Sequence, residues 1–339
     1  MKQAGMFEMD NRMGKIDCNG DPLVKHNEVI GWEMFRPELE RIRQKARKSN
    51  AGRKPYDIVL MFKVLVIQSL YNLADDAVEF QILDRLSFMR FLGLSIGDSV
   101  PDAKTVWLFR EELREAGVIE KLFARLDRHL RDNGFSARKG QIIDASIVAA
   151  PVQRNTRQEN GAIKEGLVPD GWSEEKLRQK DTDARWTKKG GRSFFGYKNH
   201  VCVDAKHKLI RGYEVTDASV HDSRVFVELL DEDNMSRDVW ADAAYRSEDA
   251  IESLEADGYR EHIQRKGVRG KELTEWEKQG NRKRARVRSR IEHVFGVQAK
   301  RAGSLIVRTI GIWRARANIG LRNMAYNLDR YGTLAKAKA

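Results

Sequence analysis

The spacing of apolar residues changes near residue 139, and this change restricts the possible folds more than any other feature of the chain. From Trp32 to Gly134 apolar residues recur at helical spacing, with short polar or glycine-containing breaks between the segments. After Lys139 short segments of strand composition, beginning with Gln141–Val148, alternate with helical ones. A length of 339 residues suggests about two domains. We therefore predict an all-α domain over residues 31–135 and, over residues 136–330, an α/β domain whose mixed sheet is flanked by helices.

Three further segments are predicted to stand apart from these elements. Residues 1–30 are polar and contain several glycines, so we expect a flexible arm. Residues 153–189 hold few apolar side chains and are expected to form a mobile polar loop within the second domain. Residues 331–339 are expected to form a tail.

Composition narrows the functional classes. Lys and Arg number 62 against 50 Asp and Glu, which gives a net charge of +12 and makes nucleic acid the first candidate partner. The longest apolar stretch, Ile58–Leu70, is too short to cross a bilayer, so no membrane partner is expected. Cys18 and Cys202 are the two cysteines and lie far apart, which excludes a disulfide scaffold and favours a reducing, cytosolic compartment.

Three acidic residues stand in unusual places. Asp144 follows two isoleucines inside a predicted strand, where Asp is depleted, and Asp242 ends another predicted strand. Glu292 is the one acid in a segment, residues 278–301, that holds nine Lys or Arg residues. Three carboxylates brought together repel one another unless a divalent cation lies among them, and hard oxygen ligands suit Mg²⁺ or Mn²⁺. Two such ions clamp the attacking and leaving oxygens of a phosphodiester displacement, and the basic flanks would hold DNA phosphates.

Each acid taken alone also has an ordinary structural explanation. Asp242 suits a helix cap or a turn, and Glu292 suits a surface ion pair with Arg288 four residues earlier. Asp144 alone supports a structural and a functional interpretation about equally. Both interpretations remain open for all three residues at this point.

Several motifs in order resemble the DDE transposases of bacterial insertion sequences, and the insertion-sequence-five group in particular. In the second half these motifs are GQIIDASIVAAP (140–151), WTKKG (186–190), FGYKNHVCVDA (195–205), TDASVHDS (216–223), ADAAY (241–245) and RVRSRIEHVF (286–295). In the first half they are GRKPY (52–56), LYNLAD (70–75), FLGL (91–94) and VPDAKTV (100–106). The resemblance covers about residues 30–330, and its strength lies in the order of the motifs.

This resemblance implies an RNase H-like catalytic core with Asp144, Asp242 and Glu292 as catalytic and metal-binding residues. It implies Mg²⁺, with Mn²⁺ as a possible substitute, at two ions per active site. The partner would be double-stranded DNA, both the terminal inverted repeats of the element and its target, cleaved at the element ends and joined by strand transfer. The helical domain would bind DNA ends or support assembly, and a homodimer or higher multimer would form on DNA in the bacterial cytoplasm, at the nucleoid.

Further residues receive roles from the same comparison and from their charge. The residues expected to contact DNA are Arg282, Lys283, Arg284, Arg286, Arg288, Arg290, Lys300, Arg301, Lys188, Lys189 and Lys198. Supporting roles fall to His221, Asp222 and Tyr245, although a simple turn hydrogen bond explains His221-Asp222 equally well. The chain departs from the family pattern at two positions: Ala285 stands where a tyrosine is common, and Ala299 stands where a lysine is common. Lys300 is one place later, and one residue rotates a helical side chain by about 100°.

Other functions fit parts of this pattern. A catalytically silent, repurposed DNA-binding protein would keep the basic segments and lose cleavage. An RNase H-like nuclease would cleave without joining strands, although it would not need the long helical domain. A glycosidase with paired carboxylates is a remote option, because the basic surroundings do not suit a neutral sugar.

Overall fold

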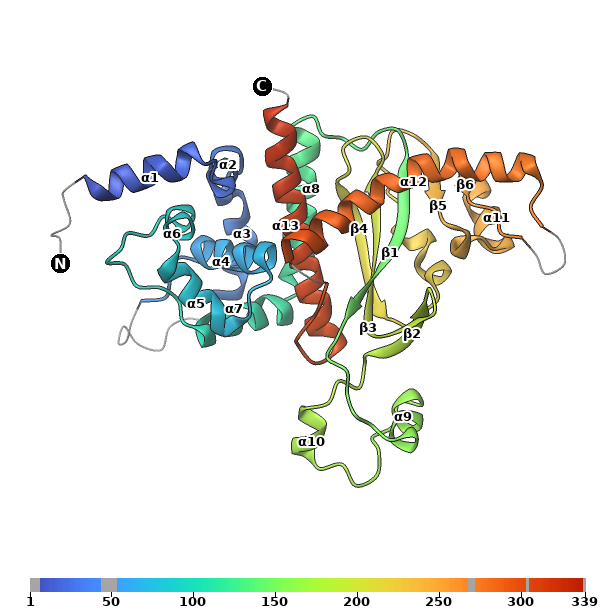
Figure 1. The fold of residues 1–339 in the computed structure, drawn as a ribbon, viewed down its shortest axis with the longest axis horizontal. Helices are drawn as coiled ribbons and strands as arrows, with labels where there is room; N and C mark the ends of the chain where they lie inside the picture. The colour runs from blue at the N-terminus through green and yellow to red at the C-terminus, as the bar shows by residue number, and fades with distance from the viewer. Residues whose placement is uncertain (1–6, 44–53, 268–271, 303–304, 338–339) are drawn as a thin grey trace. The chain divides into compact units, whose positions relative to one another are not determined.

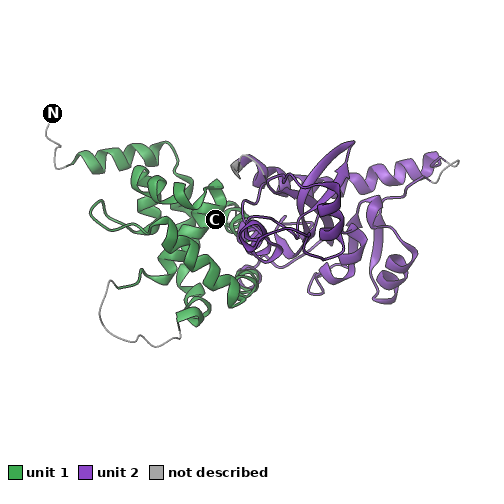
Figure 2. Ribbon diagram, turned by 90° about the horizontal axis from the view of Figure 1, so that it is seen from below, with its two compact units in different colours: residues 1–128, 324–339 green, residues 129–323 purple. Residues whose placement is uncertain are grey.

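A computed structural model describes residues 7–43, 54–267, 272–302 and 305–337, without the side chains of 301 and 302. The chain divides into two compact units (Figure 2). The first contains residues 1–128 and 324–339, and the second contains residues 129–323. No single helix among the described residues is long and apolar enough to span a membrane; the pair Ile58–Tyr71 and Asp75–Asp84, bent by 102°, meets the length and composition criteria only jointly.

The described part of the first unit is helical, as predicted for residues 31–135 (Figure 1). Its α-helices are α1 (Glu8–Cys18), α2 (Pro22–Val29), α3 (Arg36–Leu39), α4 (Ile58–Tyr71), α5 (Asp75–Asp84), α6 (Leu86–Leu92), α7 (Ala103–Glu115) and most of α8 (Val118–Asp132), with short 3₁₀ turns η1 (Trp32–Phe35) and η2 (Glu40–Arg43). Asp57 caps α4 by accepting the N–H groups of Val59 and Leu60. The α4 helix is apolar on nearly every side because it lies at the centre of the unit, where ten of its residues are buried.

The predicted arm over residues 1–30 is wrong for the part that the structure describes, because this part forms α1 and α2. Asp21 caps α2 and Pro22 occupies its first turn, a sequence signal for a helix start. Only Leu23 and His26 of α2 are buried, so the apolar repeat was too weak to indicate a helix. The predicted tail also differs, since α13 (Ile312–Lys336) continues through it with Tyr331 buried.

The second unit is built on a six-stranded mixed sheet. Its strands are β1 (Gln141–Ala149), β2 (Arg185–Lys189), β3 (Arg192–Asp204), β4 (Ile210–Asp217), β5 (Asp238–Ala241) and β6 (Arg260–Ile263). Strand β3 pairs antiparallel with β1 on one side and with β4 on the other, and β1, β5 and β6 run parallel. Helices α11 (Glu248–Ala256) and α12 (Glu275–Ala302) and much of α13 complete the unit. This arrangement confirms the predicted RNase H-like class.

The polar segment 153–189 is more ordered than a mobile loop. It contains α9 (Arg157–Lys164) and α10 (Glu174–Arg178), which extend beyond the ends of β2 and β3 in Figure 1. Thr156 and Glu159 form a capping box on α9, and Glu159 also accepts the indole N–H of Trp172 at 2.6 Å. The segment ends in β2, which pairs with residues 192–196 of β3. Polar capping and strand pairing therefore fix a segment that has few apolar contacts.

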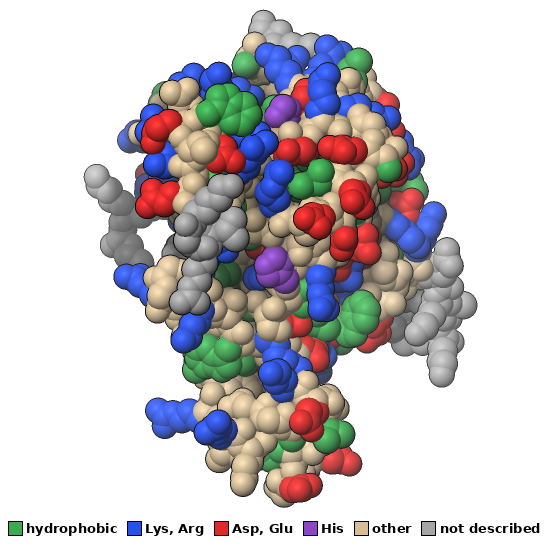
Figure 3. All heavy atoms as spheres, turned by 90° about the vertical axis from the view of Figure 1, so that its right-hand side faces the viewer, with side chains coloured by type: hydrophobic (Ala, Val, Ile, Leu, Met, Phe, Trp, Pro, Cys, Tyr) green, Lys and Arg blue, Asp and Glu red, His purple; other side chains and the backbone are tan. Residues whose placement is uncertain are grey.

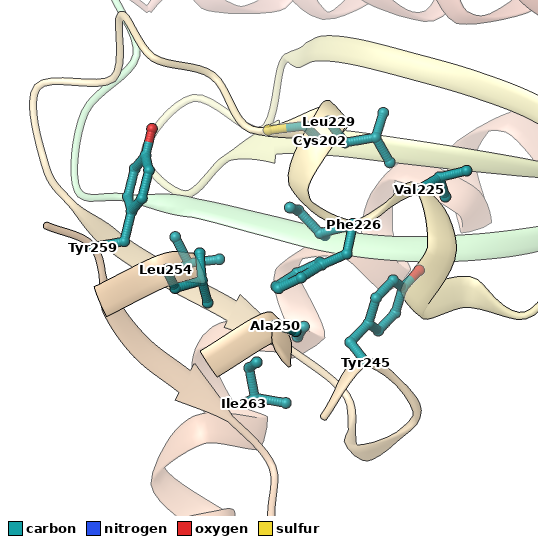
Figure 4. Packing of buried hydrophobic residues seen from close by; sticks show 12 residues of the cluster. Cys202, Val225, Phe226, Leu229, Tyr245, Ala250, Leu254, Tyr259 and Ile263 are labelled. Atoms are coloured by element: carbon teal, nitrogen blue, oxygen red, sulfur yellow. The ribbon is translucent and has the colours of Figure 1, made fainter. Parts of the chain in front are cut away.

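Buried side chains on both sides of the sheet hold the second unit together. One cluster, drawn in Figure 4, joins Ile143 and Cys202 of the sheet to α11 and to the 3₁₀ turns η3 (Asp222–Val225), η4 (Val227–Leu229) and η5 (Ala243–Tyr245). A second cluster joins β1 and β3 to α13. The connection between β4 and β5 contributes to the first cluster through the short turns η3 and η4. These contacts fix the strands from which two of the three acids emerge.

Candidate active site

The three acids singled out in the sequence line one pocket of about 670 Å³. Asp144 lies in the middle of β1, Asp242 directly follows β5, and Glu292 lies on α12. Strands β1 and β5 are parallel neighbours, with Gln141 opposite Val239 and Ile142 opposite Trp240. Continued by two residues, this register brings Asp144 beside Asp242. Helix α12 packs on both strands and supplies the third acid. Side chains from three distant parts of the sequence therefore face one cavity.

Asp144 is the buried member of the group, with 8% of the residue exposed. Burial raises the pKa of its carboxyl to about 6, and the nearby charge of Asp242 acts in the same direction. The N–H of Ala145 and the guanidinium of Arg288 oppose this increase without cancelling it. The ionised form of Asp144 therefore lacks full compensation from the protein.

Arg288 lies between two of the acids. Its Nη1 donates to Asp144 Oδ2 at 2.8 Å, and its Nη2 lies 3.5 Å from Glu292 Oε1. Arg288 and Glu292 are one helical turn apart, which places both on one face of α12. The ion pair that was an alternative explanation for Glu292 is therefore present, and it belongs to the pocket.

Asp242 likewise has both a structural role as a cap and a place in the acid pocket. Its carboxylate caps η5 by accepting the N–H of Ala244 at 2.8 Å, as expected of a turn residue. A carboxylate can accept one such bond and still offer its other lone pairs to a ligand. The capping bond fixes the direction of the side chain at the pocket.

The chemistry of the donors suits a divalent cation. Three carboxylates are hard oxygen ligands, and the raised pKa of Asp144 indicates negative charge that a bound cation would compensate. In the arrangement described, no three Asp, Glu, His or Cys side chains lie close enough together to hold a metal ion. The guanidinium of Arg288 provides the positive charge between Asp144 and Glu292 instead. The residues therefore fit a metal site in charge and ligand type.

The residues predicted to contact DNA do not form one group. Arg282, Lys283, Arg286, Arg290 and Lys300 of α12 are exposed, and so are Lys188 and Lys189 at the end of β2. Lys189 also lines the acid pocket. Arg284 and Arg288 are half-buried, and the side chain of Arg301 lies outside the described residues. On the face of the second unit seen in Figure 3, Lys and Arg alternate with Asp and Glu, so charge alone does not mark a DNA path there.

Lys198 differs from the expectation that it contacts DNA. Its ammonium group donates to the carbonyl of Val220 at 2.6 Å and to Asp222 at 2.8 Å. These contacts tie β3 to the turn before η3, through Val220, and to the start of η3, through Asp222. In this arrangement Lys198 and Asp222 stabilise the fold, and neither lines the pocket.

The other supporting residues are also structural in this geometry. His221 caps η3 through Ser223, which is the turn interaction that the sequence left open. Tyr245 is fully buried in the core cluster, and its hydroxyl has no hydrogen-bond partner among the described residues. Burial, and to a smaller extent the charges of Asp222, Asp144 and Asp242, raise its pKa.

Among the residues that line the pocket, Ser146, Phe295 and Leu305 were given no role from the sequence. The position of Ser146, two residues after Asp144 on the same strand, was the one available signal. Ala299 lines the pocket while Lys300 does not, which agrees with the expected rotation of one residue along the helix.

Comparison with known proteins identifies the family. The family model described as "Transposase DDE domain" matches residues 135–328, more than half of the chain. The chain belongs to the DDE transposase family. A second model, "Transposase domain (DUF772)", matches residues 10–112 and so includes α1 and α2. Among solved structures the chain is similar to a piggyBac transposase in a synaptic complex with hairpin DNA, at 11% identity and a TM-score of 0.48, over 94% of this chain and 76% of the other.

Membership of the family makes this chain a transposase enzyme of the insertion-sequence type, and the insertion-sequence-five group is compatible with both matches. Dependence on divalent metal is a general property of the DDE family. The acid pocket lies wholly within the segment that matches the DDE domain.

Proposed function

We propose that this transposase binds the terminal inverted repeats of its insertion sequence, cleaves one strand at each end with Mg²⁺, and transfers the freed 3′ end into target DNA. The observation that carries this proposal is the convergence of Asp144, Asp242 and Glu292 on one pocket from three separate elements. Family membership supports the reaction class. The insertion-sequence-five assignment of the sequence motifs is part of the same proposal.

Asp144, Asp242 and Glu292 would hold the metal ions, two per active site, with Mg²⁺ as the usual ion and Mn²⁺ as a substitute. Bound ions supply Lewis-acid activation of the attacking oxygen and neutralise the leaving oxygen. The chain itself positions the strand: Lys189 and Arg288 line the pocket and offer positive charge to a DNA phosphate. Phe194 and Phe295 give the pocket apolar walls against which the bound strand can pack.

The exposed basic side chains of α12 extend this contact along the DNA. Arg282, Lys283 and Arg286 are exposed on the helix that carries Glu292. Phosphate contacts of this kind position the duplex without reading its sequence. Two element ends must be processed together, so we propose that a homodimer or a higher multimer assembles on DNA.

The test uses the DNA that flanks the gene as substrate. A labelled fragment carrying both flanks and a target plasmid are incubated with the protein in Mg²⁺ or EDTA, beside Glu292→Gln, which keeps the side-chain size. We expect cuts at the flank boundaries and joined products in Mg²⁺ with the wild type alone. Binding without cleavage would favour a repurposed DNA-binding protein, and cleavage without joined products would favour a nuclease.

A further inference from the structure

The hydroxyl of Ser146 is buried in the acid pocket without a hydrogen-bond partner. Ser146 is 9% exposed and lines the same pocket as Asp144, Asp242 and Glu292. Its Oγ finds no donor or acceptor among the described residues. A buried hydroxyl without a partner costs folding free energy, so a retained one needs an explanation in the functional complex.

The neighbours of Ser146 are already engaged with other groups. Asn199 stands directly opposite on β3, and both ends of its amide bind Asn323 at 2.9 and 3.0 Å. Asp144 precedes Ser146 by two residues, so the two lie on one face of β1. The Asp144 carboxylate accepts from the N–H of Ala145 and from Arg288. The hydroxyl oxygen is covered by surrounding atoms and is left unpaired beside the most buried acid, and a change of the Ser146 rotamer would turn it toward the pocket.

The charge of the surrounding pocket indicates what kind of ligand would use this hydroxyl. Three acids and two cations, Lys189 and Arg288, line the pocket together with Ser146, so an anionic ligand would enter it with the proposed metal ions bound. An anionic oxygen placed between these cations and the acids would be a good acceptor for a neutral O–H donor. A phosphate of a DNA strand offers such an oxygen.

We propose that Ser146 contacts the substrate by donating a hydrogen bond to a non-bridging oxygen of the DNA phosphate that enters this pocket. This inference rests on the proposed function and adds a substrate-contacting residue to it. Ser146 keeps its proton throughout and forms no covalent bond. Its hydroxyl fixes the orientation of the phosphate relative to Asp144.

Two matched pairs of variants isolate the hydroxyl. Ser146→Ala differs from the wild type by the oxygen atom, and Ser146→Val differs from Ser146→Thr by replacement of a hydroxyl with a methyl group. Each protein is measured by thermal unfolding without DNA, by the affinity for an end duplex in Ca²⁺, and by single-turnover cleavage of that duplex in Mg²⁺. The duplex is the element end mapped in the wild-type reaction.

The expected result separates stability from function. Ser146→Ala unfolds at the temperature of the wild type or above it, because it removes an unpaired buried hydroxyl. Its cleavage rate falls by about 100-fold, at the lower end of the scale for losing one preorganised donor to the reacting group. Ser146→Thr cleaves about tenfold faster than Ser146→Val.

Two results would overturn the inference while leaving the proposed function intact. The first is wild-type cleavage by Ser146→Ala. The second is a lower unfolding temperature for Ser146→Ala with a loss of DNA affinity that matches its unfolded fraction, which would make the hydroxyl structural. A wild-type protein that cleaves no flank DNA contradicts the proposed function first, and this inference with it.

Discussion

Arg288 binds two of the three acids at once, and this contact sets the charge balance of the pocket. Its guanidinium is 2.8 Å from Asp144 and 3.5 Å from Glu292, and these carboxylates are also the proposed metal ligands. A guanidinium and a divalent cation compete for the same oxygens. Removal of the guanidinium should therefore strengthen metal-ion binding by these carboxylates in the absence of DNA.

We expect Arg288→Gln to bind Mn²⁺ about 5- to 10-fold more tightly than the wild type without DNA. The reason is the loss of one positive charge next to the buried Asp144 and the exposed Glu292, worth about 1 kcal/mol at high effective dielectric. Titration followed by electron paramagnetic resonance of free Mn²⁺ measures the affinity. Arg286→Gln is the matched control, because Arg286 is exposed on the same helix and does not line the pocket. Equal Mn²⁺ affinity of Arg288→Gln and wild type would contradict the competition.

His200 gives the fold a pH dependence of its own. The residue is fully buried, its Nε2 lies 2.9 Å from Thr216 Oγ1, and burial lowers its pKa to about 4. Asp222 opposes this decrease, and Lys198 adds to it. In the unfolded chain the group titrates near the ordinary value of 6.5. The folded state therefore binds fewer protons than the unfolded state between pH 6.5 and about 4.

We expect the stability contributed by His200 to be complete above pH 6.5 and to be lost as the pH falls toward 4. The loss amounts to at most about 3 kcal/mol, from the separation of the two pKa values. Denaturant unfolding of wild type and His200→Gln at pH 7.5 and pH 5 measures it. The difference between the two pH values should shrink in the variant, and an equal difference in both proteins would contradict the assignment.

Single residues differ in how well the sequence predicted them. Asp144, Asp242 and Glu292 were predictable because acids are unusual within an apolar strand, at the end of a strand or in a basic helix. Lys198 was not, because its ammonium is held by a turn that only the folded chain brings near. Ser146 was not, because an unpaired hydroxyl is a property of the packed structure. Their roles in the reaction stay predictions.

At the scale of elements, β3 organises the second unit. Its first part pairs with β2, its second part with β4, and residues 196–204 pair with β1. The central hairpin and the parallel strands were predictable from their apolar composition, whereas β2 was not because Trp186 is its one apolar residue. The junction at Gly196 allows these pairings to meet. Its φ is +151°, and an added Cβ would lie 2.2 Å from the carbonyl oxygen of Val148.

We expect Gly196→Ala to destabilise the protein by about 2–4 kcal/mol, through the clash with β1 and the strained backbone. Chemical denaturation of the second-unit transition measures the loss. Gly161→Ala is the control, because Gly161 lies in α9, has no atom within 4 Å of the added Cβ, and has no positive φ. The control should be neutral or slightly more stable. Equal stability of Gly196→Ala and Gly161→Ala would contradict the tight approach of β1 and β3.

At the scale of the whole molecule, the net charge of +12 predicts salt-dependent binding to DNA. Exposed basic side chains of α12 should account for part of this dependence. Replacing Arg282, Lys283 and Arg286 with Gln is expected to reduce the slope of log K against log salt by about 2–3, since each phosphate contact contributes about 0.9. Fluorescence anisotropy at several salt concentrations measures the slope.

The charge-conserving variant with Arg282→Lys and Arg286→Lys should keep the wild-type slope, because a lysine contacts phosphate as a point charge. A Gln triple variant with the wild-type slope would place the DNA path elsewhere.

The overall order of helical and mixed-sheet units was predictable from hydrophobic spacing. The division of the last helix between the two units was not predictable from the sequence. Residues 324–339 belong to the first unit although they are far from residues 1–128 in the sequence, and hydrophobic spacing carries no information about such long-range packing.

The most direct test of the central claim is a change of metal preference at a single proposed ligand. Asp242→Cys replaces a hard oxygen ligand with a softer thiolate, which binds Mn²⁺ better than Mg²⁺. Cleavage of the mapped element end is measured in each metal for wild type and variant. The account predicts that Asp242→Cys is inactive in Mg²⁺ and recovers measurable cleavage in Mn²⁺, while the wild type cleaves in both. Wild-type cleavage by Asp242→Cys in Mg²⁺ would contradict it.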